Sequence, residues 1–195
     1  DPTRGIGAAR DWLYEQFQEV AKTSDGRMTI EVQTFEQQPG RFPRIAAPTK
    51  VTNIVATLRG TQPESADRIY VVSGHYDSMC SRPTDADCDA PGADDDASGV
   101  AVALESARVM APHKFNATIV FMAVAGEEQG LVGSTYFAEQ AKQKKLDIDA
   151  MVTNDIIGHG KGSLRVLSAV VSSNETTEEA RPRLSVGGQN DGPAR

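Results

Sequence analysis

The chain has 195 residues, which is the size of one ordinary domain. Hydrophobic residues make up 39% of it, enough for a packed core. The formal net charge of -7 and the pI of about 5.0 argue against a nucleic-acid partner, because such proteins present a basic surface. No apolar run approaches the roughly 20 residues that a membrane-spanning helix needs, so we expect no membrane span.

The first part of the chain predicts one helix and two strands. Residues 3–22 have the periodicity of an amphipathic helix. Its apolar face contains Trp12, Leu13, Phe17 and Val20. Residues 28–35 (MTIEVQTF) and 50–60 (KVTNIVATLRG) alternate between apolar and polar side chains, as half-buried strands do. Proline and glycine between these two segments predict a loop.

Three later segments, 69–78, 118–130 and 150–158, begin with nearly continuous apolar runs. Such runs are typical of strands that are buried on both faces of a sheet. Two helical stretches, 97–110 and 131–145, lie between them in the sequence. This alternation predicts an α/β fold, in which a mostly parallel or mixed central sheet is flanked by helices on both faces.

Each buried strand is followed by acidic residues or histidine. The first leads to His75 and Asp77, the second to Glu127 and Glu128, and the third to Asp155. In an open α/β sheet, ligands bind beyond the carboxyl ends of the strands. We therefore expect these side chains to meet at one edge of the sheet.

Three consecutive aspartates, Asp94, Asp95 and Asp96, precede the helix at 97–110 at that same edge. The N-terminus of a helix favours an acidic residue, which accounts for one of the three. Carboxylates that lie close together raise each other's pKa or bind a cation. Carboxylates alone would suit calcium or magnesium, but an added histidine favours zinc or a similar transition metal. The adjacent Glu127 and Glu128 can divide metal binding and proton transfer between them, as a hydrolase requires.

Four motifs of the chain resemble, in order, those of the co-catalytic di-zinc aminopeptidases of the bacterial leucyl-aminopeptidase type. They are GHYDS (74–78), PGADDDASG (91–99), AGEEQGLVGS (125–134) and TNDIIG (153–158). The resemblance is close over about residues 70–158 and loose before them. It implies the phosphorylase/hydrolase-like fold of zinc exopeptidases, two zinc ions, and removal of the first residue from peptides with a free N-terminus.

The resemblance also implies a role for each site residue. The implied zinc ligands are His75, Asp95, Glu128 and Asp155. Among them Asp95 would bridge the two zinc ions, and Glu128 would bind only the second. Glu127 would be the general base, and Asp77 would fix the tautomer of His75 and raise its basicity.

One ligand of the family pattern is missing from this sequence. The family places a final histidine, which binds the second zinc, well after the third motif. Here only His159 follows Asp155, four residues later, which is too early. We interpret residues 1–195 as a single zinc-peptidase domain that is incomplete at its C-terminal end. It would hold one complete zinc site and one that lacks its last ligand.

The two cysteines, Cys80 and Cys88, lie eight positions apart in a segment rich in proline and aspartate. They are free surface thiols or a disulfide that closes a small ring. Neither lies in an apolar run, where a buried inert thiol is expected, so we predict the disulfide. It would place the protein in an oxidising compartment, either secreted or periplasmic.

Two other functions remain open on the sequence alone. The first is a carboxypeptidase or glutaminyl-cyclase-like zinc enzyme. A carboxypeptidase needs a basic residue for the substrate carboxylate, and none stands out in the motifs; a single-zinc cyclase needs fewer ligands than are present. The second is a non-catalytic peptide-binding protein, which would have lost ligands or the base, Glu127. Side-chain preference, oligomeric state and the choice of zinc over manganese or cobalt stay undetermined.

Overall fold

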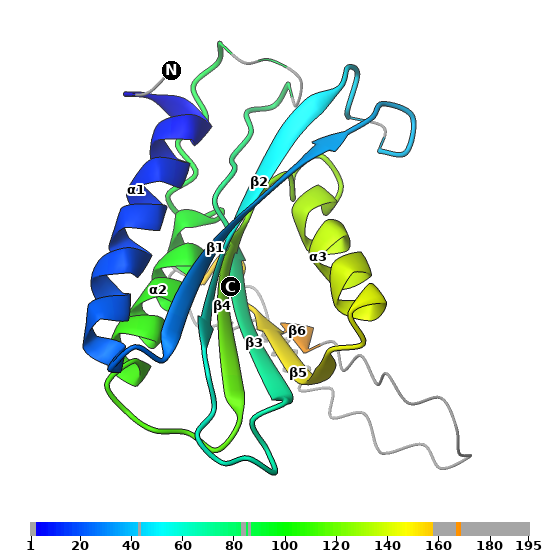
Figure 1. Cartoon of the computed structure of the whole chain (residues 1–195). Helices are drawn as coiled ribbons and strands as arrows, with labels where there is room; N and C mark the ends of the chain where they lie inside the picture. Colours follow the sequence, from blue (N-terminus) through cyan, green and yellow to red (C-terminus); the bar gives the residue numbers. More distant parts are fainter. Residues whose placement is uncertain (1–2, 43, 83–84, 86, 158–166, 169–195) are drawn as a thin grey trace, which may run out of the picture.

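The computed structural model describes residues 3–42, 44–82, 85, 87–157 and 167–168 (Figure 1). The helices are α1 (Gly5–Ala21), α2 (Ala97–Met110) and α3 (Val132–Gln143), with a 3₁₀ turn, Lys22–Ser24, after α1. The strands are β1 (Met28–Gln37), β2 (Thr49–Leu58), β3 (Arg68–His75), β4 (Thr118–Val124), β5 (Asp147–Thr153) and β6 (Leu167–Ser168). No helix in this part of the chain is long and apolar enough to cross a membrane.

The described strands form one mixed sheet with the order β1-β2-β4-β3-β5-β6. The central strand β3 is parallel to both of its neighbours, β4 and β5. The outer pairs, β1 with β2, β2 with β4 and β5 with β6, are antiparallel. Because β3, β4 and β5 run in the same direction, their carboxyl ends lie at one edge of the sheet.

Helices cover both faces of this sheet. Figure 1 shows α1 and α2 on one face and α3 on the other. Side chains alternate along a strand, so Phe121 of β4 packs in the core beneath α1 and α2, whereas Met122 packs in the core beneath α3. All seven residues of β4 are buried, which explains its continuous apolar run. The predicted α/β sheet with helices on both faces is confirmed.

Two glycines let α2 approach the sheet edge closely. A Cβ atom on Gly74, in β3, would lie 2.4 Å from the carbonyl carbon of Gly99. A Cβ atom on Gly99, in the first turn of α2, would lie 2.3 Å from the carbonyl oxygen of Asn154. Both distances are shorter than real Cβ contacts, so neither position accepts a larger residue without movement. This close packing brings the start of α2 to the ends of β3 and β5.

Candidate metal centre

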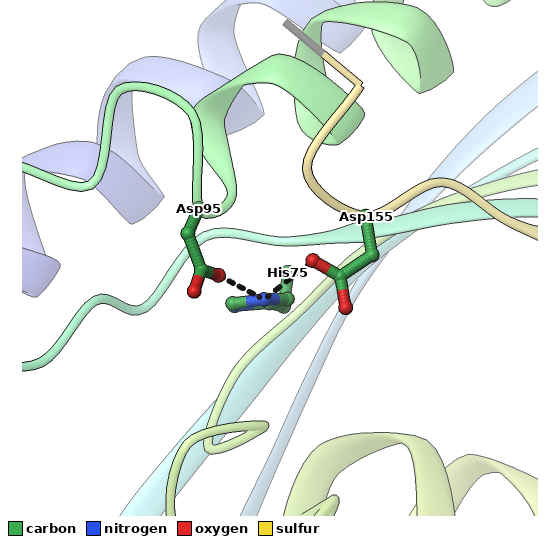
Figure 2. Close-up of side chains that lie close together, drawn as sticks. All are labelled: His75, Asp95 and Asp155. Atoms are coloured by element: carbon green, nitrogen blue, oxygen red, sulfur yellow. Dashed lines mark ion pairs between the residues drawn. The ribbon is translucent and has the colours of Figure 1, made fainter. Parts of the chain in front are cut away.

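Three predicted ligands, His75, Asp95 and Asp155, lie together at this edge (Figure 2). His75 Nε2 is 3.1 Å from Asp95 Oδ1 and 3.9 Å from Asp155 Oδ1. One ligand atom from each residue lies within 4.8 Å of the others. His75 ends β3, Asp95 precedes α2, and Asp155 follows β5. The fold therefore brings together residues that are 20 and 60 positions apart in the sequence.

The third aspartate of the run, Asp96, is the cap of α2. It is buried, and its Oδ1 accepts a hydrogen bond from the backbone N–H of Gly99 at 2.9 Å. Its Oδ2 accepts a second hydrogen bond from the backbone N–H of His75 at 3.0 Å. Asp96 thus ties the helix to the end of β3. The preceding residue, Asp95, is left to face the imidazole of His75.

Two buried polar atoms at this position make no hydrogen bond to any described residue: His75 Nε2 and Asp155 Oδ1. Although Asp95 Oδ1 is 3.1 Å from Nε2, the pair lacks hydrogen-bond geometry. Buried polar atoms without partners are rare because they lose hydration without compensation. A metal ion between them would satisfy both atoms. Imidazole nitrogen and carboxylate oxygen are ligands that zinc accepts, so these residues fit zinc.

The imidazole of His75 is oriented by Asp77. The Nδ1 atom of His75 lies 3.0 Å from the backbone carbonyl oxygen of Asp77 and 3.5 Å from its Oδ1. A carbonyl oxygen can only accept, so Nδ1 must carry the hydrogen of this bond. The lone pair of a neutral imidazole then lies on Nε2, which faces the two aspartates. This is the tautomer that a metal ligand requires.

The carboxylate of Asp77 also holds the turn that contains Glu127 and Glu128. Its Oδ1 accepts from the backbone N–H of Glu127 at 3.2 Å, and its Oδ2 from that of Glu128 at 3.1 Å. The side chain of Glu127 reaches the cluster, with Oε2 4.0 Å from His75 Nε2. Glu128 does not belong to the cluster of His75, Asp95 and Asp155. It does lie close enough to Asp95 to interact with it electrostatically.

The charges of the cluster perturb the pKa of several members. Burial raises the pKa of Glu127, and the negative charges of nearby aspartates raise it further. Burial likewise raises the pKa of Glu128, with Asp95 as the next contribution. For His75, burial lowers the pKa, but the hydrogen bond and charge of Asp77, together with the charges of Asp96 and Glu127, outweigh it and bring the pKa to about 9. In the absence of a metal, Glu127, Glu128 and His75 therefore bind protons at a higher pH than ordinary side chains of their kind.

Sequence reasoning missed one buried residue that supports the site, Asn53 of β2. Its Oδ1 accepts from the backbone N–H of Ala125 at 3.2 Å, and its Nδ2 donates to the carbonyl oxygen of Gly133 at 2.9 Å. Nδ2 also donates to Gln33 Oε1 at 3.0 Å. Asn53 thus holds both ends of the turn that contains Glu127. The available signal was an asparagine inside a strand, where this residue is depleted.

The predicted disulfide between Cys80 and Cys88 is present in the structure, with the two Cα atoms 6.4 Å apart. It closes a loop in the segment that joins Asp77 to the aspartates before α2. Ser78 Oγ donates to the carbonyl oxygen of Ala90 at 2.8 Å and closes the base of the same loop. The disulfide and this hydrogen bond restrain the chain between two elements of the metal centre.

The family model of Peptidase family M28 matches residues 53–188, and the chain belongs to this family. It is 48% identical over 204 residues to a protein of Pyricularia oryzae named "Probable zinc metalloprotease", covering 100% of this chain and 40% of that protein. Among solved structures, the LapA aminopeptidase of Legionella pneumophila is similar, with 25% identity and a TM-score of 0.54 over 78% of this chain and 37% of that one. The predicted resemblance to zinc peptidases is thereby confirmed.

A glutaminyl cyclase from an Acidobacteriales bacterium shares the fold, with a TM-score of 0.61 and 19% identity over 80% of this chain and 52% of that one. This likeness concerns the fold alone. The chain spans less than half the length of the curated relatives it matches. His159, the one histidine that follows Asp155, lies outside the described residues.

Proposed function

We propose that this chain forms the catalytic centre of a zinc-dependent aminopeptidase. One observation carries the proposal: His75 Nε2 and Asp155 Oδ1 are buried, face each other without hydrogen bonds to described residues, and have Glu127 beside them. Bound zinc would supply Lewis acidity, which lowers the pKa of water and polarises a carbonyl group. His75, Asp95 and Asp155 would hold the first zinc.

Glu127 is our proposed general base. Its carboxylate lies 4.0 Å from the nitrogen that faces the metal position, and its side chain is partly exposed to solvent. Burial and neighbouring carboxylates raise its pKa, which makes it a better proton acceptor than an ordinary glutamate. It would take a proton from the attacking water and transfer it to the leaving amine. Asp77 supports this role because it holds the backbone N–H of Glu127.

A second zinc would use Asp95 as a shared ligand. The side chain of Asp95 is half exposed, so one oxygen can face His75 while the other faces outward. Burial raises the pKa of Glu128, and Glu128 is near enough to Asp95 for the charge of Asp95 to raise this pKa further. Asp95 would then bridge two zinc ions, with Glu128 as a ligand of the second. The remaining ligand of this second site is not found among the described residues.

The acidic cluster also supports aminopeptidase specificity over the two enzymatic alternatives. A free α-amine is cationic, and the carboxylates around the metal position provide negative charge to hold it. The similarity to the LapA aminopeptidase agrees with this assignment. The glutaminyl cyclases share less than a quarter of their residues with the chain, so their likeness does not favour cyclase activity.

We further propose that the enzyme acts in an oxidising compartment, as a secreted or periplasmic protein. The disulfide between Cys80 and Cys88 supports this, because the cytosol keeps most thiols reduced.

A set of three peptides tests the proposed function. The zinc-loaded protein, in its full natural length, is incubated with Leu-Ala-Ala, with its N-acetylated form and with Gln-Ala-Ala. An aminopeptidase releases leucine from the first and leaves the acetylated peptide intact. Release of C-terminal alanine from both the free and the acetylated peptide would instead show a carboxypeptidase. Conversion of Gln-Ala-Ala to its pyroglutamyl form without hydrolysis would show a cyclase.

A further inference from the structure

The described part of the loop that joins β1 to β2, residues 38–42 and 44–48, packs against the turn that contains Glu127 and Glu128. Ile45 of this loop is buried in a cluster with Ala125 and Val132, which stand at the two ends of that turn. Its backbone N–H donates to the carbonyl oxygen of Phe42 at 3.0 Å, which tightens the loop. This part of the loop is therefore held in a defined place beside the metal centre.

The loop contains two arginines with different environments. Arg41 forms an ion pair with Glu139 of α3 at 2.6 Å and lies over the ring of Phe42. Arg44 has no carboxylate within ion-pair distance in the part of the chain that the structure describes. Its Nη1 instead donates to the backbone carbonyl oxygen of Glu128 at 2.5 Å and lies 3.5 Å from Met79 Sδ. Arg44 is thus a cation without a carboxylate partner among the described residues, bound to the main chain of the turn that contains Glu127 and Glu128.

The choice of acceptor is informative. A cation that served to neutralise the cluster would pair with a carboxylate, yet Arg44 bonds the main-chain oxygen of Glu128. This arrangement leaves the Glu128 carboxylate available for a metal. This hydrogen bond holds one end of the guanidinium, and the buried neighbour Ile45 anchors the backbone that carries the side chain. The side chain of Arg44 is exposed, so its remaining N–H groups can reach a bound molecule.

We propose that Arg44 determines substrate specificity by binding a carboxylate on the leaving-group side of the scissile bond. The inference rests on the proposed peptidase function. In this proposal the acidic cluster binds the cationic α-amine of a peptide, and Arg44, which is exposed beside Glu128, binds an anionic group further along the same peptide. A guanidinium presents parallel N–H groups that match the two oxygens of a carboxylate. The carboxylate is either the C-terminus of a dipeptide or an acidic side chain after the scissile bond.

Two pairs of peptides test this proposal. Leu-Ala and Leu-Ala-amide differ only in the terminal carboxylate, and Leu-Glu-amide and Leu-Gln-amide differ only in a side-chain carboxylate. Values of kcat/KM are measured for the zinc-loaded protein in its full natural length and for Arg44→Gln. The matched control is Arg41→Gln, which removes an exposed arginine from the same loop. We expect the wild type and Arg41→Gln to prefer the charged member of at least one pair.

In Arg44→Gln, kcat/KM for the preferred charged peptide falls roughly 10- to 100-fold, the effect of losing a charge-assisted hydrogen bond. The uncharged partner changes by less than about twofold. The pair that shows this difference identifies the source of the carboxylate. An equal loss on both members of each pair would mean that Arg44 only supports the turn at Glu128. Equal rates on both members in the wild type would also overturn the proposal.

Binding measurements separate this proposal from the proposed function. The same peptides are titrated by calorimetry into zinc-loaded Glu127→Gln protein, with and without Arg44→Gln. Tighter binding of the charged peptide, lost with Arg44→Gln, supports carboxylate recognition even if the wild type hydrolyses no peptide. Equal binding of charged and uncharged peptides contradicts it even if the wild type is an active aminopeptidase.

Discussion

The carboxylate of Asp77 holds the backbone of Glu127, whose N–H donates to Asp77 Oδ1 at 3.2 Å. The same Oδ1 lies 3.5 Å from His75 Nδ1, and the other oxygen accepts from the N–H of Glu128. One buried side chain thus connects the imidazole of the centre with the turn that contains the proposed base. The positions of His75 and of the proposed base, Glu127, are therefore coupled through Asp77.

This coupling predicts that Asp77→Asn weakens zinc binding and the fold together. The amide has one oxygen, so one of the two backbone N–H groups loses its acceptor, and the negative charge beside His75 is lost. We expect zinc affinity to fall about 10- to 100-fold and the free energy of unfolding to fall by about 1–3 kcal/mol. Competition with a chromophoric chelator and urea denaturation measure the two effects. Asp67→Asn, an exposed site before β3, is the control and should change neither. Unchanged zinc affinity in Asp77→Asn would contradict the coupling.

Glu127→Gln should abolish peptide hydrolysis while zinc stays bound. The amide keeps the shape of the side chain but cannot accept a proton from water, so we expect kcat to fall by at least about 10²-fold. Zinc content stays at the wild-type level because Glu127 is not a proposed ligand. Glu139→Gln, on the exposed surface of α3, serves as the matched control. Substantial turnover by Glu127→Gln would remove this residue from the mechanism.

Asn53→Ala should destabilise the protein and lower kcat more than it raises KM. The substitution leaves the N–H of Ala125 and the carbonyl oxygen of Gly133 without their buried partner. Unpaired buried groups and the small cavity together cost about 2–4 kcal/mol. The turn that holds Glu127 would shift, which affects chemistry more than binding. Asn116→Ala, at an exposed position, is the control for both measurements. If Asn53→Ala unfolds at the same urea concentration as the wild type, Asn53 does not hold the turn.

Zinc affinity should rise with pH. Zinc binds the neutral imidazole, and the metal-free protein holds a proton on His75 up to a pKa of about 9. Below this pKa, each unit of pH increases the neutral fraction about tenfold. We therefore expect the affinity for zinc to increase about tenfold per unit between pH 6.5 and 8.5, with release of one proton. Titrations in two buffers of different ionisation enthalpy count the proton. An affinity that is constant over this range would contradict the pKa of His75.

Much of the fold and of the candidate centre could be predicted from local sequence. The apolar run of β4 predicts burial on both faces, and all seven residues are buried. Parallel strands predict that His75 and Asp155 meet, because His75 is the last residue of β3 and Asp155 comes just after the end of the neighbouring strand β5. The sequence predicts that one of the three aspartates caps α2, but it does not predict which one. Only the path of the backbone decides that Asp96 reaches the N–H of Gly99.

Residues from outside the motifs could not be predicted in the same way. Arg44 lies in a loop with no periodic pattern, and its nearness to Glu128 depends on how Ile45 packs against the sheet. Asn53 lies in β2, a strand in which apolar and polar residues alternate. This alternation predicts on which face of the sheet a side chain lies, but it does not predict the hydrogen-bond partners of that side chain. Its partners, Ala125 and Gly133, are more than 70 positions away. Such long-range contacts are set by tertiary packing, which a local pattern does not encode.

We propose that His75, Asp95 and Asp155 hold zinc, with Asp95 shared between two ions. Elemental analysis of dialysed protein, in its full natural length, tests it most directly when wild type, Asp95→Asn and Asp155→Asn are compared. We expect two zinc ions per chain in the wild type, loss of both in Asp95→Asn and loss of one in Asp155→Asn. Undiminished zinc in both variants would contradict it.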